Sequence, residues 1–123
     1  MQKKRNKYGN TICEYDGMKF HSIAEMHRYQ ELKLLEKAGE ITDLVLQPKF
    51  EVVPKTEHER AATYTADFQY KEKHSSSLSP NGYVYKDVVE DVKSEATAKD
   101  KTYILNRKLF RQKYPDFEFR EIL

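Results

Sequence analysis

Two segments typical of β-strands lie in the middle of the chain, and their pairing constrains the fold more than any other feature. Residues 63–70 and 83–93 are rich in aromatic and β-branched side chains, whereas residues 75–82 between them are rich in Ser, Pro and Gly. This pattern is typical of two antiparallel strands joined by a longish connection. We therefore expect a β-hairpin at the centre of the fold.

The hairpin predicts a cluster of charged side chains. Because side chains alternate between the two faces of a strand, Asp91 and Lys93 project on one face and Glu90 on the other. A register that brings Asp67 beside Asp91 makes two carboxylates and one ammonium group converge. Two close carboxylates repel unless a cation lies between them, and a hard divalent ion with oxygen ligands suits that position. Alternation also places four residues of the first strand on one face: Tyr64, Ala66, Phe68 and Tyr70.

Composition bounds the remaining architecture. A chain of 123 residues, with 38% hydrophobic and 34% charged residues, forms one domain with a thin core. Apolar runs do not exceed three residues, so we expect no membrane span and a soluble, intracellular protein. The single cysteine, Cys13, cannot form an internal disulfide. Four scattered histidines without zinc spacing argue against a structural zinc site.

The first 21 residues predict an arm and a small hairpin. Four bases and no acid fall within residues 1–7, so residues 1–10 are expected to form a flexible basic arm. The arm is either a solvated terminus or a phosphate contact, and the sequence leaves both open. Asp16-Gly17 between two short alternating segments predicts a tight hairpin turn. Residues 11–123 form the predicted domain.

A first helix is predicted from Ser22 to Gly39. Ser22 is a suitable N-cap and Gly39 a suitable stop. Glu25 has two readings, because a glutamate three residues after a serine completes a capping box. On a partly apolar stripe of the helix, the same carboxylate can face inward toward the sheet instead.

The other predicted elements complete an α/β order. Residues 43–53 are expected to form the first core strand, interrupted at Gln47-Pro48 because proline disrupts strands. A helix over residues 97–114 follows the hairpin, and residues 117–122 form the last strand. The order is helix, three strands, helix, strand, which predicts a mixed sheet flanked by helices. The last strand can run parallel to the strand that carries Asp91.

The second helix presents two kinds of side chain. Tyr103, Phe110 and Tyr114 share one stripe and should face the core. The remaining surface is basic, and it is either a solvated face or a surface that holds nucleic-acid phosphates near the carboxylates. The candidate nucleic-acid contacts are Lys99, Lys101, Arg107, Lys108 and Arg111.

Asp67 followed by Asp91-Val92-Lys93 resembles the active-site motif of the PD-(D/E)XK nuclease superfamily. The wider sequence resembles a small phage- and prophage-associated branch, a family of unknown function. The resemblance covers nearly the whole chain. It rests on Glu14-Tyr15-Asp16-Gly17, Ser22-Ile23-Ala24-Glu25, Arg28-Tyr29, Leu46-Gln47-Pro48-Lys49-Phe50, Tyr64-Thr65-Ala66-Asp67-Phe68, Glu90-Asp91-Val92-Lys93 and Lys108-Leu109-Phe110.

The resemblance implies a restriction-endonuclease-like αβββαβ core and a metal site. Mg²⁺ or Mn²⁺ would be held by Asp67, Asp91, the Val92 carbonyl and Glu25, with Lys93 as a further catalytic residue. Two departures stand out, since Ala66 replaces the usual proline and Asp91 the commoner glutamate. Glu90 is the neighbour that a one-residue register error would exchange for Asp91.

The implied function is that of a Mg²⁺-dependent endodeoxyribonuclease. A phage-type Holliday-junction resolvase is the first specific expectation, acting as a homodimer on branched or duplex DNA, with no membrane partner. The implied location is the cytoplasm of a bacterial host, from a phage or prophage gene. A general DNA endonuclease and a transposase-like end-cleaving subunit are alternative nucleases. The alternatives from other classes are a catalytically silent nucleic-acid-binding module and a protein-interaction partner of a phage replication or packaging machine.

Overall fold

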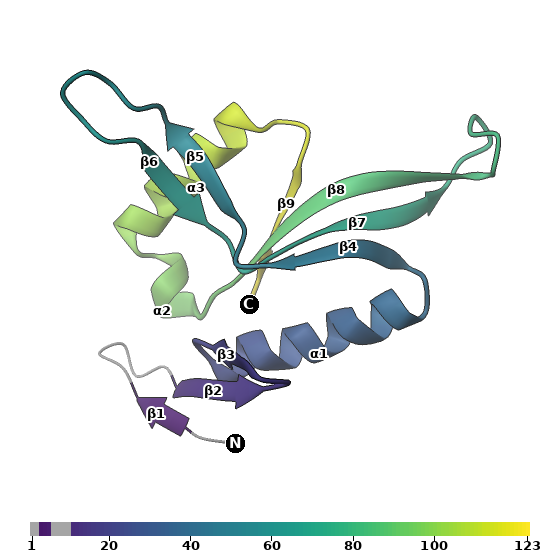
Figure 1. The fold of residues 1–123 in the computed structure, drawn as a ribbon, viewed down its shortest axis with the longest axis horizontal. Coiled ribbons are helices and arrows are strands. Elements are labelled where there is room, and N and C mark those ends of the chain that lie inside the picture. Colours follow the sequence, from purple (N-terminus) through teal and green to yellow (C-terminus); the bar gives the residue numbers. More distant parts are fainter. Residues whose placement is uncertain (1–2, 6–10) are drawn as a thin grey trace.

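A mixed four-stranded sheet with helices on both faces forms the centre of the molecule (Figure 1). The computed structural model describes residues 3–5 and 11–123. The strand order is β4-β7-β8-β9. The bounds of these strands and of the two longer helices are β4 Ile41–Leu46, β7 Phe68–Ser75, β8 Tyr83–Val92, β9 Glu118–Ile122, α1 Ile23–Lys37 and α3 Lys101–Lys113. None of the helices in the described ranges is long and apolar enough to cross a membrane.

The central hairpin is confirmed. Strands β7 and β8 pair antiparallel, from Phe68 opposite Glu90 to Ser75 opposite Tyr83. Strand β9 pairs parallel with β8 and places Glu121 beside Asp91. A parallel neighbour is expected here because a helical crossover separates the two strands. The predicted order of helix, three strands, helix and strand is therefore present, with a further two-stranded ribbon inserted.

That ribbon corrects two predicted strands. Residues 43–53 and 63–70 do not form continuous strands, because each is broken in the middle. The pieces beyond the breaks, β5 (Lys49–Val53) and β6 (Ala62–Thr65), pair with each other and leave the main sheet. In Figure 1 this ribbon turns away from β4 and β7 toward α3.

The two breaks lie side by side and bond to each other. Gln47 has a φ of 54° and Pro48 has no N–H, so the strand ladder ends there. The Gln47 N–H donates to the Asp67 carbonyl at 3.0 Å, and the Ala66 N–H donates to the Pro48 carbonyl at 3.0 Å. The crossing is thus stabilised by long-range backbone hydrogen bonds rather than by local turn residues.

The breaks also separate residues that alternation placed on one face. Tyr64 and Ala66 pack with α3, whereas Phe68 and Tyr70 pack on the α1 side. The prediction that all four share one face is wrong, because the chain bends between Ala66 and Phe68. In β8 the predicted alternation holds, and Val88 and Val89 face opposite layers.

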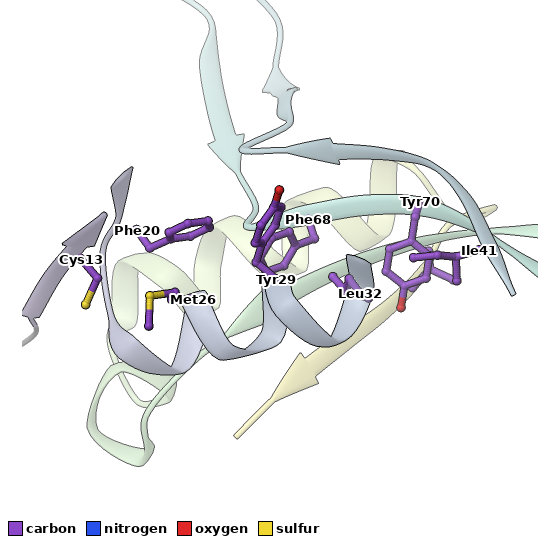
Figure 2. Packing of buried hydrophobic residues seen from close by; sticks show 9 residues of the cluster. Cys13, Phe20, Met26, Tyr29, Leu32, Ile41, Phe68 and Tyr70 are labelled. Atoms are coloured by element: carbon purple, nitrogen blue, oxygen red, sulfur yellow. The ribbon is translucent and has the colours of Figure 1, made fainter. Parts of the chain in front are cut away.

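Helix α1 begins and ends where predicted. The Ser22 Oγ accepts the Glu25 N–H at 3.1 Å. Gly39, with a φ of 81°, ends the helix with two hydrogen bonds, from its own N–H to Glu36 and from the Glu40 N–H to Leu35. Figure 2 shows the buried cluster in which side chains of α1, the small N-terminal hairpin and the sheet pack together: Cys13, Phe20, Met26, Tyr29, Leu32, Ile41, Phe68 and Tyr70.

The N-terminal hairpin is confirmed as well. Strands β2 (Thr11–Tyr15) and β3 (Met18–Phe20) pair antiparallel around Asp16 and Gly17, which both have positive φ, at 53° and 73°. Within the predicted basic arm, Lys3–Arg5 forms strand β1, which pairs with β2. The remainder of that arm, residues 1–2 and 6–10, lies outside the described residues.

The helix predicted over residues 97–114 is two helices. Helix α2 (Glu95–Ala98) and α3 are separated at Lys99 and Asp100. Asp100 starts the second helix, because its side chain accepts the Tyr103 N–H at 2.9 Å. The predicted aromatic stripe faces the core, where Phe110 is fully buried and stacks with Tyr114 at 5.3 Å between ring centroids.

Candidate functional site

A cleft of about 420 Å³ opens where the start of α1, the end of β8 and the start of α2 meet. Four of the predicted site residues line it, and Asp91 lies buried behind them with 1% of its surface exposed. Gln47, at the break between β4 and β5, also lines the cleft. The lining site residues are Glu25, Asp67, Val92 and Lys93.

The register of the central hairpin brings Asp67 and Asp91 together. The Asp67 N–H donates to the Glu90 carbonyl at 3.1 Å. The Val92 N–H donates to Asp67 Oδ2 at 2.7 Å, which holds the carboxylate against the end of β8. The negative charge of Asp91 also acts on the Asp67 carboxyl group and raises its pKa. The convergence predicted from alternation is therefore present in the structure.

One oxygen of Asp91 has an unusual environment. The Tyr64 hydroxyl donates to Oδ2. Lys93 Nζ lies 2.9 Å from Oδ1, so this buried oxygen has an ion-pair partner, although it accepts no directed hydrogen bond among the described residues. A buried carboxylate needs such a partner, because burial without one is costly.

Glu25 points its carboxylate toward the cleft. The cap of α1 uses the Glu25 N–H, which Ser22 accepts, whereas Glu25 Oε1 accepts from Gln47 Nε2 at 2.9 Å. Only 4% of Glu25 is exposed. Its backbone therefore belongs to the helix cap, and its side chain belongs to the cluster of acids.

Burial and mutual repulsion raise the pKa values of Asp67 and Glu25 in this cluster. Burial raises the pKa of Asp67 to about 8, and the negative charges of Glu25 and Asp91 add to the effect. Burial also raises the pKa of Glu25, although His21 acts in the opposite direction. Although Lys93 contributes one positive charge, the carboxylates still repel each other, and a bound proton or cation relieves that repulsion.

Lys93 lies between two clefts. It lines the cleft described above and a second one of about 440 Å³, which also contains Lys99, Asp100 and Tyr103. The ammonium group is 4.8 Å from the centroid of the Tyr103 ring. Because a quarter of the Lys93 side chain is exposed, this cation can contact both Asp91 and a ligand in the cleft.

The predicted basic surface is only partly gathered near the clefts. Lys99 lines the second cleft, whereas Lys101, Lys108 and Arg111 are exposed along α3. Arg107 is half-buried and already occupied, since Nη1 donates to Glu121 at 3.1 Å and the guanidinium lies 5.5 Å from the Tyr103 ring centroid.

Glu90, the alternative to Asp91, lies on the other face of the sheet. It is fully buried and forms a bidentate pair with Arg28, with N–O distances of 2.8 and 2.6 Å. The Tyr70 hydroxyl also donates to it. All of these contacts are on the α1 side, so Asp91 is the acid of β8 that accompanies Lys93.

The sequence predicts no role in the site for Gln47 or Tyr64, although both lie in segments that carry the family resemblance. The positive φ of Gln47 brings its amide to Glu25, and the bend after Tyr64 brings its hydroxyl to Asp91. The Gln-Pro interruption of residues 43–53 is a local signal for Gln47, whereas Tyr64 has no local signal beyond its place in a strand.

The donor set suits a hard cation without enclosing one. No three His, Cys, Asp or Glu side chains in the described part of the chain form a ready metal cage. The carboxylates of Asp67 and Asp91 are nevertheless the ligands that Mg²⁺ prefers. Mg²⁺ keeps several waters and needs only one or two protein carboxylates.

Comparisons with known proteins place the chain in one family. Neither the curated proteins nor the solved structures include a significant match. The sequence profile that does match covers residues 5–123, which is nearly the whole chain. The chain therefore belongs to the family described as "Protein of unknown function (DUF1064)".

Proposed function

We propose that this protein is a metal-dependent DNA endonuclease whose active site contains Asp67, Asp91 and Lys93. One observation carries the proposal: three carboxylates from separate elements, two of them buried, converge beside a lysine at an open cleft. Buried like charges oppose folding and cluster at functional sites. The same residues carry the resemblance to the PD-(D/E)XK nuclease superfamily.

Asp67 and Asp91 are the residues that would hold Mg²⁺ or Mn²⁺, with Glu25 and the Val92 carbonyl beside them. When bound, the metal supplies a Lewis acid for a phosphodiester and a means to activate water. The fit rests on oxygen donors, a raised Asp67 pKa and the convergence of these carboxylates at one cleft.

The surrounding residues hold these acids in position. The Val92 N–H fixes one oxygen of Asp67, the Tyr64 hydroxyl fixes one oxygen of Asp91, and Gln47 fixes one oxygen of Glu25. Tyr64 stays protonated as a donor, because burial and the Asp91 charge raise its pKa. Lys93 faces the cleft and neutralises the charge of a phosphate placed there.

DNA is the proposed substrate, and a four-way junction is the first form to test. Lys93 and Lys99 share the second cleft, which adjoins the first, and exposed bases continue along α3. A row of lysine and arginine side chains of this kind neutralises phosphates along a nucleic-acid backbone. We propose a phage-type Holliday-junction resolvase, for which a homodimer matches the two symmetric cleavage points of a junction.

The direct test is cleavage of labelled four-way, duplex and single-stranded DNA with Mg²⁺ or Mn²⁺. We expect symmetric, metal-dependent cuts in the junction by the wild type. Asp91→Asn and Lys93→Ala should each lose at least about 1,000-fold in rate, equivalent to about 4 kcal/mol in the barrier. Chelation of the metal should abolish cleavage.

Matched controls come from the same strand. Asp87→Asn and Lys86→Ala change an acid and a base of β8 outside the cleft and should cut like the wild type. Binding of all DNA forms without cleavage would instead indicate a catalytically silent binding module. Variants at Asp91 and Lys93 that cut like the wild type would refute the proposed site.

A further inference from the structure

A buried ion pair joins α1 to β8 on the face of the sheet opposite Asp91. Arg28 Nε donates to Glu90 Oε1 at 2.8 Å and Arg28 Nη2 to Glu90 Oε2 at 2.6 Å. The Glu90 side chain is fully buried, and the Arg28 side chain is 19% exposed. Two parallel bonds between planar groups fix orientation as well as distance.

Each partner of this pair is a close neighbour of a site acid. Arg28 lies three residues after Glu25, about one turn further along α1. Glu90 directly precedes Asp91 in β8. The pair therefore connects the helix that carries one carboxylate of the cluster to the strand that carries another.

The other contacts between α1 and the sheet are mainly apolar. Met26, Tyr29 and Leu32 are the buried apolar side chains of the helix. Apolar burial is non-directional, so it holds the helix on the sheet without fixing its position along the strands. The bidentate pair is directional, so it fixes the position of α1 along the strands.

Stability alone does not account for this arrangement. Replacing a buried ion pair by apolar residues of similar volume is often neutral or stabilising, because desolvation offsets much of the attraction. We propose that Arg28 and Glu90 are positioning residues, which set the distance of Glu25 from Asp67 and Asp91 and thereby the metal affinity of the cluster. This inference rests on the proposed function.

The test compares two apolar replacements in the full chain. Arg28→Met with Glu90→Met removes the clamp. Arg120→Met with Glu72→Met removes another bidentate pair, with both N–O distances at 2.8 Å, which lies outside the cleft and reaches Glu90 only through the Tyr70 hydroxyl. Calorimetry with Mn²⁺ measures affinity, thermal unfolding measures stability, and junction cleavage measures activity. We expect the first variant to remain folded and bind Mn²⁺ about 10- to 100-fold more weakly. The control should keep wild-type affinity.

A second comparison isolates the route through Glu25. In a Glu25→Gln background, adding the two clamp substitutions should weaken Mn²⁺ binding no further, because their effect acts through that carboxylate. Additive losses would show that the substitutions disturb the fold generally and would overturn the positioning role. If the double variant unfolds, Arg28→Lys decides, since it keeps the charge but loses the bidentate geometry and should lower the affinity.

The outcomes separate this inference from the proposed function. A wild type that binds Mn²⁺ and cleaves, together with a clamp variant of equal affinity, refutes the clamp and leaves the nuclease intact. A wild type that neither binds Mn²⁺ nor cleaves any DNA refutes the nuclease, and the clamp has then no cluster to position.

Discussion

Glu90 and Asp91 are adjacent in β8 and almost equally buried, with 0% and 1% of their surfaces exposed, yet their surroundings differ. Glu90 receives two hydrogen bonds from Arg28 and one from Tyr70, so both of its oxygens are occupied. Asp91 receives one from Tyr64, forms an ion pair with the partly exposed Lys93 at 2.9 Å and lies beside another carboxylate.

The difference separates a structural charge from the charge that we propose is functional. A buried carboxylate with a full set of donors contributes to a unique arrangement of helix and strands. A buried carboxylate that shares one partly exposed lysine with neighbouring carboxylates retains the capacity to bind a cation. The balance of charge around each acid, rather than its burial, is therefore what distinguishes the two faces of this sheet.

The strongest test of this contrast is the stability of two single variants. Glu90→Ala leaves the Arg28 guanidinium without its partner and should lower the free energy of unfolding by about 3–5 kcal/mol. Asp91→Asn relieves repulsion with Asp67 and should leave stability unchanged or raise it. Urea denaturation measures both. An equal loss of stability in the two variants would show that Glu90 and Asp91 do not differ in the way described.

The next effect is the pH dependence near neutrality. Because the pKa of Asp67 rises to about 8 in the folded state, the folded protein holds a proton there that the unfolded chain loses near pH 4. Stability should therefore fall as pH rises from about 4 to 8, by at most about 1.4 kcal/mol per pH unit. Asp67→Asn should flatten this slope in melting curves. If the pH dependence of stability is unchanged in Asp67→Asn, another titrating group causes it.

Arg120 and Glu72, on the face that packs with α1, should show the opposite slope in acid. Hydrogen bonds from Arg120 lower the pKa of Glu72 to about 2. The stability from this pair is complete above about pH 4.5 and is lost as pH falls toward 2. Because the pair is partly exposed, we expect a loss of about 1 kcal/mol. Glu72→Gln should remove this loss of stability in acid. An unchanged loss in that variant would show that another group causes it.

The smallest effects concern the helix caps at the cleft. Ser22→Ala should lower stability by about 1 kcal/mol, because the Glu25 N–H loses its acceptor. Ser94→Ala, at the start of the four-residue α2, should cost about half as much. Circular dichroism melts measure both. A larger loss for Ser94→Ala would mean that α2 stabilises the fold more than its length suggests.

Much of the fold was predictable because its signals are local. Alternation in residues 83–93 predicted the opposite faces of Glu90 and Asp91, and the Ser22 and Gly39 caps predicted the extent of α1. Asp16-Gly17 predicted the small hairpin. Each of these features depends on residues close together in the chain.

The unpredicted features depend on contacts between distant segments. The break at Ala66-Asp67 has no proline or glycine and exists because it bonds to the break at Gln47-Pro48. The ion pair between Arg28 and Glu90 joins residues that are 62 positions apart in the chain. Sequence alternation could place Glu90 on a face but could not show which partner it meets there.

The alternation of Glu90 and Asp91 also restricts how this protein can evolve. Residues 76–82, between β7 and β8, can change in length without moving either acid. A one-residue insertion within β8 would instead exchange the two faces, placing a carboxylate opposite the wrong layer and leaving Arg28 without its acceptor. Surviving length variants among relatives should therefore be concentrated at the tip of the hairpin and absent from the strand beneath it.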